Sequence, residues 1–150
     1  MPLKRLDYYE TDPNSIKGLL ELEKYVAGSG LDRSLYELVK LRASQINGCA
    51  YCIDMHSKDA RKAGETEQRL YALSAWRETS FYSERERAAL AWTEAMTLIS
   101  ENDMSDSLYT SVAEHFSEKE HLALTMAIIA INGWNRLAIG FRKEPGSYNP

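Results

Sequence analysis

Apolar residues recur every three or four positions through most of this chain, which is the spacing of amphipathic helices. The clearest case is residues 32–48, where leucine, valine and isoleucine fall on one face and Gly48 follows the last of them. Prolines and glycines fall between the periodic segments, and few stretches alternate as strands do. The pattern predicts an all-α fold of six or seven helices.

Capping residues predict where these helices begin. Ser83 and Ser117 are each followed three residues later by glutamate, which is the pattern of a capping box. We expect residues 143–150 to be irregular, and one domain over 1–150 because no repeat or linker divides the chain. The expected helices cover about residues 12–27, 32–48, 49–64, 66–76, 83–100, a short segment from 105, and 117–142.

The last predicted helix is apolar around its whole circumference over residues 122–131. Such a helix must be covered on all sides, so it is either the central core helix or partly in contact with a second subunit. The longest uncharged stretch, 122–135, has 14 residues. This is shorter than the ~20 residues that span a bilayer, so we expect a buried helix and no membrane partner.

Composition places the chain among folded globular proteins, with 44% hydrophobic and 27% charged residues. A net charge of −4 disfavours binding to nucleic acid or anionic membranes, because such proteins usually carry a basic excess. No apolar signal-peptide core follows Met1, so we expect a cytoplasmic protein. In that reducing compartment a permanent structural disulfide is uncommon.

The two cysteines of the chain nevertheless lie close together, as Cys49-x2-Cys52-x3-His56. At about 100° per residue, all three side chains fall within one narrow stripe of a helix that begins near Cys49. The N–H groups at a helix N-terminus stabilise a thiolate, and His56 is within reach of Cys52 as a proton acceptor. The spacing predicts a redox dithiol with its own base.

Other interpretations of the trio stay open. The residues could be ordinary core residues, since buried cysteine is common as a small hydrophobe. Two cysteines and one histidine could also bind zinc with a fourth ligand, but no second pair completes the set, and His115 and His121 are awkwardly six apart. We therefore predict no metal and no cofactor.

With Glu37 added, separated from Cys49 by eleven residues, the spacing resembles the core motif of the AhpD-like alkylhydroperoxidases. These belong to the carboxymuconolactone decarboxylase superfamily. Residues 35–52 are similar to that family throughout, and 86–95 and 130–138 support the similarity. The resemblance covers roughly residues 15–142.

The resemblance implies an all-helical domain that assembles into trimers or hexamers and reduces hydroperoxides. Cys49 and Cys52 would be the redox pair, and His56 and Glu37 the proton relay. An external dithiol, from a lipoyl protein or a thioredoxin-like protein, would regenerate the pair. One departure is Tyr51, where well-studied AhpD proteins carry a second histidine; a phenol titrates near pH ~10 and cannot act as the same base.

The residues alone do not single out Glu37, because it falls off the apolar face of its helix and could form a surface pair with Lys40. Two other functions also remain: a non-redox decarboxylase-like enzyme, and a metal-binding or oligomerisation module without turnover. The remaining candidates for pocket or packing roles are Trp92, Glu94, Asn132 and Asn135.

Overall fold

The computed structural model describes residues 2–150, and its regular secondary structure is helical, with no strand in that range. The all-α prediction is confirmed. The α-helices are α1 (Tyr8–Thr11), α2 (Lys17–Ala27), α3 (Arg33–Asn47), α4 (Ala50–Lys62), α5 (Glu67–Tyr71), α6 (Glu84–Thr97), α7 (Asp106–Ala113) and α8 (Glu118–Gly140). The 3₁₀ helices are η1 (Pro13–Ile16), η2 (Leu73–Glu78) and η3 (Ile99–Glu101).

Local sequence signals account for most helix boundaries. Ser83 and Ser117 both form the predicted capping boxes, with reciprocal bonds to the glutamates three residues later. The single helix predicted over 66–76 is wrong, because the chain breaks into α5 and η2 and Ala75 has non-helical angles of φ −118° and ψ 30°. Helix α1 was not predicted, since its four residues are too short to show a period.

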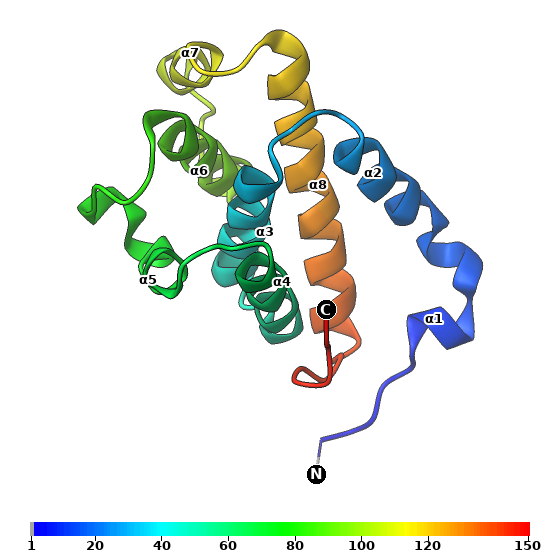
Figure 1. Ribbon diagram of the computed structural model, residues 1–150. Helices are drawn as coiled ribbons and strands as arrows, with labels where there is room; N and C mark the ends of the chain where they lie inside the picture. Colours follow the sequence, from blue (N-terminus) through cyan, green and yellow to red (C-terminus); the bar gives the residue numbers. More distant parts are fainter. Residues whose placement is uncertain (1) are drawn as a thin grey trace.

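Helix α8 is the centre of the bundle (Figure 1). Helices α2, α3, α4, α6 and α7 all pack against it. By length and composition α8 could cross a membrane, but its contacts with five other helices make it the central helix of the bundle. Helix α3 lies between α4, α6 and α8, so it is enclosed on several sides at once.

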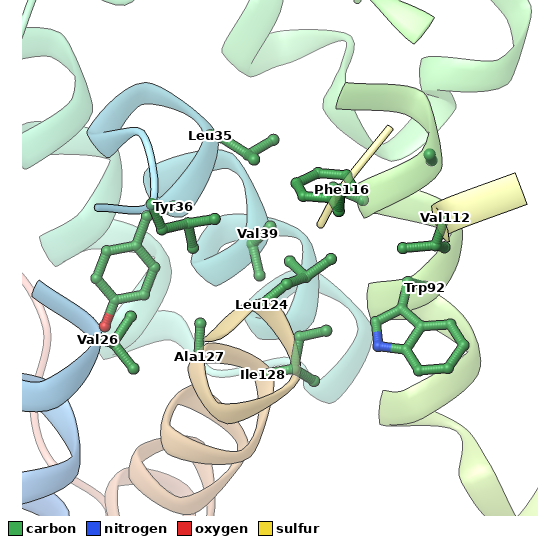
Figure 2. Packing of buried hydrophobic residues seen from close by; sticks show 13 residues of the cluster. Val26, Leu35, Tyr36, Val39, Trp92, Val112, Phe116, Leu124, Ala127 and Ile128 are labelled. Carbon is green, nitrogen blue, oxygen red and sulfur yellow. The ribbon is translucent and has the colours of Figure 1, made fainter. Parts of the chain in front are cut away.

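The largest apolar cluster joins the first halves of α3 and α8 to α2, α6 and α7 (Figure 2). Fully burying a side chain such as Val39 or Leu124 contributes roughly 1.5–3 kcal/mol. This cluster fixes α3 against α8. The cysteines lie beyond it, packed near Ala138 toward the C-terminal end of α8.

One side of α8 still exposes large apolar residues. Leu122 is 59% exposed, Ile129 46% and Ile139 43%. The sides of α8 that pack against the other helices are core, whereas Leu122 and Ile129 are open to solvent. The expected homo-oligomer stays a prediction.

Candidate active site

A tight turn between α3 and α4 sets the position of the cysteines. Helix α3 ends at Asn47, and Gly48 adopts the left-handed conformation at φ 72°, which glycine tolerates without a steric penalty. Cys49 is then extended and is the N-cap of α4. Its Sγ accepts a hydrogen bond from the backbone N–H of Cys52 at 3.3 Å. The sulfur therefore lies at the positive end of the α4 dipole.

Cys49 and Cys52 are joined by a disulfide across this first turn, with their Cα atoms 5.3 Å apart. Both residues are buried, with exposed fractions of 1% and 3%. They pack with Ala138 of α8 and with Tyr51. In this oxidised form the pair offers no thiolate to zinc, which needs deprotonated cysteine ligands.

His56 lies one turn after Cys52, and its side chain is only 12% exposed. Both residues line the same cavity of about 330 Å³. That volume is at the lower end of the usual range for small-molecule pockets, about 300–1,000 Å³. The remaining lining residues are Tyr8, Tyr9, Leu20, Glu23, Lys40, Tyr51, Met55, Asp59, Trp134, Ala138 and Lys143.

Glu37 reaches this site from α3. Its Oε2 lies 3.6 Å from His56 Nδ1, and its Oε1 accepts a hydrogen bond from Lys40 Nζ at 2.9 Å. The alternative of a pair between Glu37 and Lys40 on the surface is wrong, because the two residues pair but are only 5% and 6% exposed. The pair is buried because α3 is covered by α4 and α6 as well as α8.

Glu37 is held as a carboxylate in this environment. Burial by itself raises the pKa of Glu37, but the neighbouring His56 and Lys40 together outweigh it, so the pKa lies below its ordinary value. A buried negative charge is thus fixed next to the imidazole. The arrangement can hold a proton on His56 Nδ1 and leave the other ring nitrogen available as a base.

Asp59 is a third member of the cluster that the sequence analysis missed. Its Oδ2 lies 4.0 Å from His56 Nδ1. The only sequence signal was its place three residues after His56 on the same helix. Two carboxylates therefore face one histidine nitrogen.

Glu37, His56 and Asp59 offer donor atoms within 4.8 Å of one another, so this cluster could hold a metal ion. The ammonium of Lys40 already neutralises Glu37 at 2.9 Å, and a cation placed beside it would meet that positive charge. The charges favour a proton relay over a metal site.

Tyr51 lines the cavity at the position where the resemblance expects a second histidine. Burial, followed by the nearby Asp54 carboxylate, raises the pKa of Tyr51. The phenol therefore stays protonated near neutral pH. It can donate a hydrogen bond into the cavity but cannot serve as a base there.

The four weaker sequence candidates lie in the described part of the chain but outside the cavity lining. Trp92 Nε1 donates to a threonine hydroxyl on α8 at 3.0 Å. Glu94 accepts from arginine and tryptophan side chains. Asn47 Nδ2 donates to the Oδ1 atoms of Asn132 (3.0 Å) and Asn135 (2.9 Å), which ties the end of α3 to α8 just before the cysteine turn.

Comparisons with known proteins show which family this chain belongs to. Residues 13–95 match the model of the carboxymuconolactone decarboxylase family. The uncharacterised protein YdfG of Bacillus subtilis is 47% identical over 144 residues, covering 96% of this chain and 98% of YdfG. An AhpD alkyl hydroperoxide reductase of Mycobacteroides abscessus is 47% identical over 49 residues, covering 32% of this chain and 28% of that protein.

A solved structure has nearly the same fold. ATU0492 of Agrobacterium tumefaciens is a protein of unknown function for which the assignment AhpD, an antioxidant defence protein, has been suggested. It superposes with a TM-score of 0.93 at 44% identity, covering 97% of this chain and all of that one. With the buried Cys49–Cys52 pair, His56 and Glu37 in place, the chain belongs to the carboxymuconolactone decarboxylase family as an AhpD-like member.

Proposed function

We propose that this protein is a thiol-dependent peroxidase that reduces hydroperoxides through Cys49 and Cys52. The observation that carries the proposal is the cavity wall on which Cys52 and His56 lie one helical turn apart, with Cys49 already bonded to Cys52. A dithiol that closes a disulfide beside a histidine in a small cavity is suited to two-electron redox chemistry. The AhpD-named relatives support the same chemistry.

In the reduced protein, His56 takes the proton of the Cys52 thiol. Glu37 fixes the imidazole through its Oε2, 3.6 Å from Nδ1, so that the other ring nitrogen acts as the base. The N-terminal end of α4 stabilises the resulting thiolate. We assign the attack to Cys52 because its side chain lines the cavity, whereas Cys49 is 1% exposed.

The Cys52 thiolate then attacks the distal oxygen of the hydroperoxide. The O–O bond breaks, the sulfur is oxidised to a sulfenic acid, and the leaving alkoxide takes the proton from the His56 imidazolium and departs as an alcohol. Next, the Cys49 thiol attacks the Cys52 sulfur. The disulfide forms, and the hydroxyl group leaves with the Cys49 proton as water.

An external dithiol supplies the two electrons and two protons that regenerate the thiols by exchange. Both sulfurs are at most 3% exposed, so the reductant must enter the 330 Å³ cavity. This favours a slender dithiol, such as a lipoyl group, over a thioredoxin-like protein that presents its thiol on a broad surface. The reaction needs no metal and no cofactor.

We infer that the working form is a homo-oligomer, a trimer or hexamer, in the cytoplasm. The exposed strip of α8 with Leu122 and Ile129, and the neighbouring Ile99 at 54% exposure, support an apolar subunit contact. Light scattering coupled to gel filtration measures the mass directly. An Ile129→Glu variant that leaves the mass unchanged would contradict an interface on this strip.

A mass-spectrometric time course tests the peroxidase. Reduced protein is mixed with one equivalent of cumene hydroperoxide, and the thiols are followed. We expect fast loss of two hydrogens within one chain, and a sulfenic acid on Cys52 that dimedone traps in Cys49→Ser. The His56→Ala variant should react about 10²- to 10⁴-fold more slowly. Normal oxidation by hydroperoxide in Cys52→Ser would contradict the mechanism.

The matched family is described by a decarboxylase activity, so a second candidate function is a non-redox decarboxylase-like enzyme acting on a lactone acid. Such chemistry has no need of a disulfide pair, so the double variant Cys49→Ser/Cys52→Ser separates the two functions. Turnover of a lactone acid that survives in this variant, with no reaction of the wild type toward hydroperoxides, would favour the second candidate.

A further inference from the structure

The C-terminal tail, residues 143–150, lies along α4 instead of extending into solvent (Figure 1, where the red end of the chain lies beside α4). It has no regular secondary structure, as predicted. Side chains of α4 nevertheless bind its backbone at several points. The bonds are Lys58 Nζ to the carbonyls of Gly146 (3.4 Å) and Tyr148 (3.1 Å), Lys62 Nζ to that of Pro150 (2.9 Å), and Gly146 N–H to Asp54 Oδ2 (3.1 Å).

One side chain of the tail reaches the site itself. The hydroxyl of Tyr148 donates a hydrogen bond of 2.6 Å to Asp59 Oδ1. This bond, together with partial burial, raises the pKa of Tyr148 to about 12. The hydroxyl therefore remains a donor at neutral pH, and it restrains the carboxylate group of Asp59.

The restraint matters because of what the other oxygen of Asp59 faces. Asp59 Oδ2 lies 4.0 Å from His56 Nδ1, and Glu37 Oε2 lies 3.6 Å from the same nitrogen. Within residues 2–150 neither His56 Nδ1 nor Glu37 Oε2 has a hydrogen-bond partner. The imidazole is thus oriented by two carboxylates at slightly more than hydrogen-bond distance, and one of them is held by the tail.

We propose that Tyr148 is a positioning residue of the redox site. By holding Asp59 Oδ1, it keeps Oδ2 directed at His56, so that the proton of the imidazole stays on Nδ1 and Nε2 remains the base for Cys52. The proposal rests on the proposed role of His56 in the peroxidase. It extends the relay beyond Glu37 and connects the end of the chain to the redox cysteines.

Removal of the hydroxyl alone isolates this role. In Tyr148→Phe the bonds that Lys58 and Lys62 donate to tail carbonyls, and the bond that Gly146 N–H donates to Asp54, are unchanged, so the tail stays in place. Asp59, whose side chain is 16% exposed, is then free to turn toward solvent. The matched control is Tyr71→Phe: this tyrosine lines a surface hollow together with Tyr148, and it is 77% exposed.

A double-mutant cycle tests the connection. The rate of disulfide formation with cumene hydroperoxide is measured by stopped flow in Tyr148→Phe, Asp59→Asn and the double variant. We expect Tyr148→Phe to be about 10-fold slower than wild type and Asp59→Asn about 10- to 100-fold slower, the usual range for groups that orient a functional histidine. The double variant should match Asp59→Asn, because Tyr148 acts only through Asp59. Tyr71→Phe should react at the wild-type rate.

NMR of the His56 ring nitrogens supplies a readout that a purely structural role would not change. We expect the Nδ1–H tautomer in wild type and a mixture of tautomers in Tyr148→Phe. A wild-type rate and tautomer in Tyr148→Phe, or a double variant whose loss is the product of the two single losses, would overturn the proposal. Failure of wild type to react faster than a free thiol would refute the peroxidase instead, while the tautomer would still report on the positioning by Tyr148.

Discussion

Reduction of the Cys49–Cys52 disulfide should lower the stability of the protein only slightly. The two cysteines are three positions apart, so the bond closes a loop of four residues. In the loop-entropy description, such a cross-link contributes about 2 kcal/mol. After reduction, a thiolate at the N-terminus of α4 recovers about 0.3–1 kcal/mol through the helix dipole. The expected net loss is therefore about 1–2 kcal/mol.

The packing of the bundle explains why the fold does not depend on this bond. The main apolar cluster joins α2, α3, α6, α7 and α8, and it lies apart from the cysteines. Helix α4 is independently held by its own buried contacts with α3, where Ala60 packs with Leu38 and Leu41. We therefore expect the disulfide to open and close without unfolding of the helix that carries it.

Thermal denaturation followed by far-UV circular dichroism measures this loss. For a chain of this size, about 1–2 kcal/mol corresponds to a decrease in Tm of about 2–8 °C between the oxidised and the reduced protein. The double variant Cys49→Ser/Cys52→Ser is the control, because it removes the cross-link without leaving a thiolate. Unfolding on addition of reductant, or a decrease in Tm above about 15 °C, would refute the reasoning and make the disulfide a structural one.

Two further predictions concern buried charges. Lys40→Met removes the ammonium 2.9 Å from Glu37, so the pKa of Glu37 should rise. The free energy of unfolding, measured in urea, should fall by about 3–5 kcal/mol. In the control Arg61→Met, which breaks an exposed pair with Glu67, it should fall by less than about 1 kcal/mol. Burial lowers the pKa of His121 in the folded protein, so the unfolded chain binds a proton at this histidine more readily than the folded protein does. The contribution of neutral His121 to the free energy of unfolding is complete above the ordinary histidine pKa of about 6.5, and it is lost as the pH falls below that value. Urea titrations across that range should show a smaller pH dependence in His121→Phe, and an unchanged dependence would contradict this assignment.

The Cys49–Cys52 pair could be found from the sequence because its geometry is local. Gly48 ends α3 in a left-handed turn, Cys49 caps α4, and Cys52 and His56 follow at intervals that the helix itself converts into one stripe. The capping boxes at Ser83 and Ser117 are local in the same sense, since every bond in them joins residues three apart. Such features depend on backbone geometry and not on what packs against the helix.

The charges around His56 were decided by tertiary structure. A helical wheel places Glu37 off the apolar face of α3, and only the packing of α3 against α4, α6 and α8 together buries it with Lys40. The bond between Tyr148 and Asp59 joins residues 89 positions apart, and no periodic pattern reports such a contact. The sequence by itself determined most of the helices and the stripe of Cys49, Cys52 and His56, because 3.6-residue periodicity and capping are local. Only the folded bundle decided which carboxylates reach the histidine, because burial depends on which helices meet.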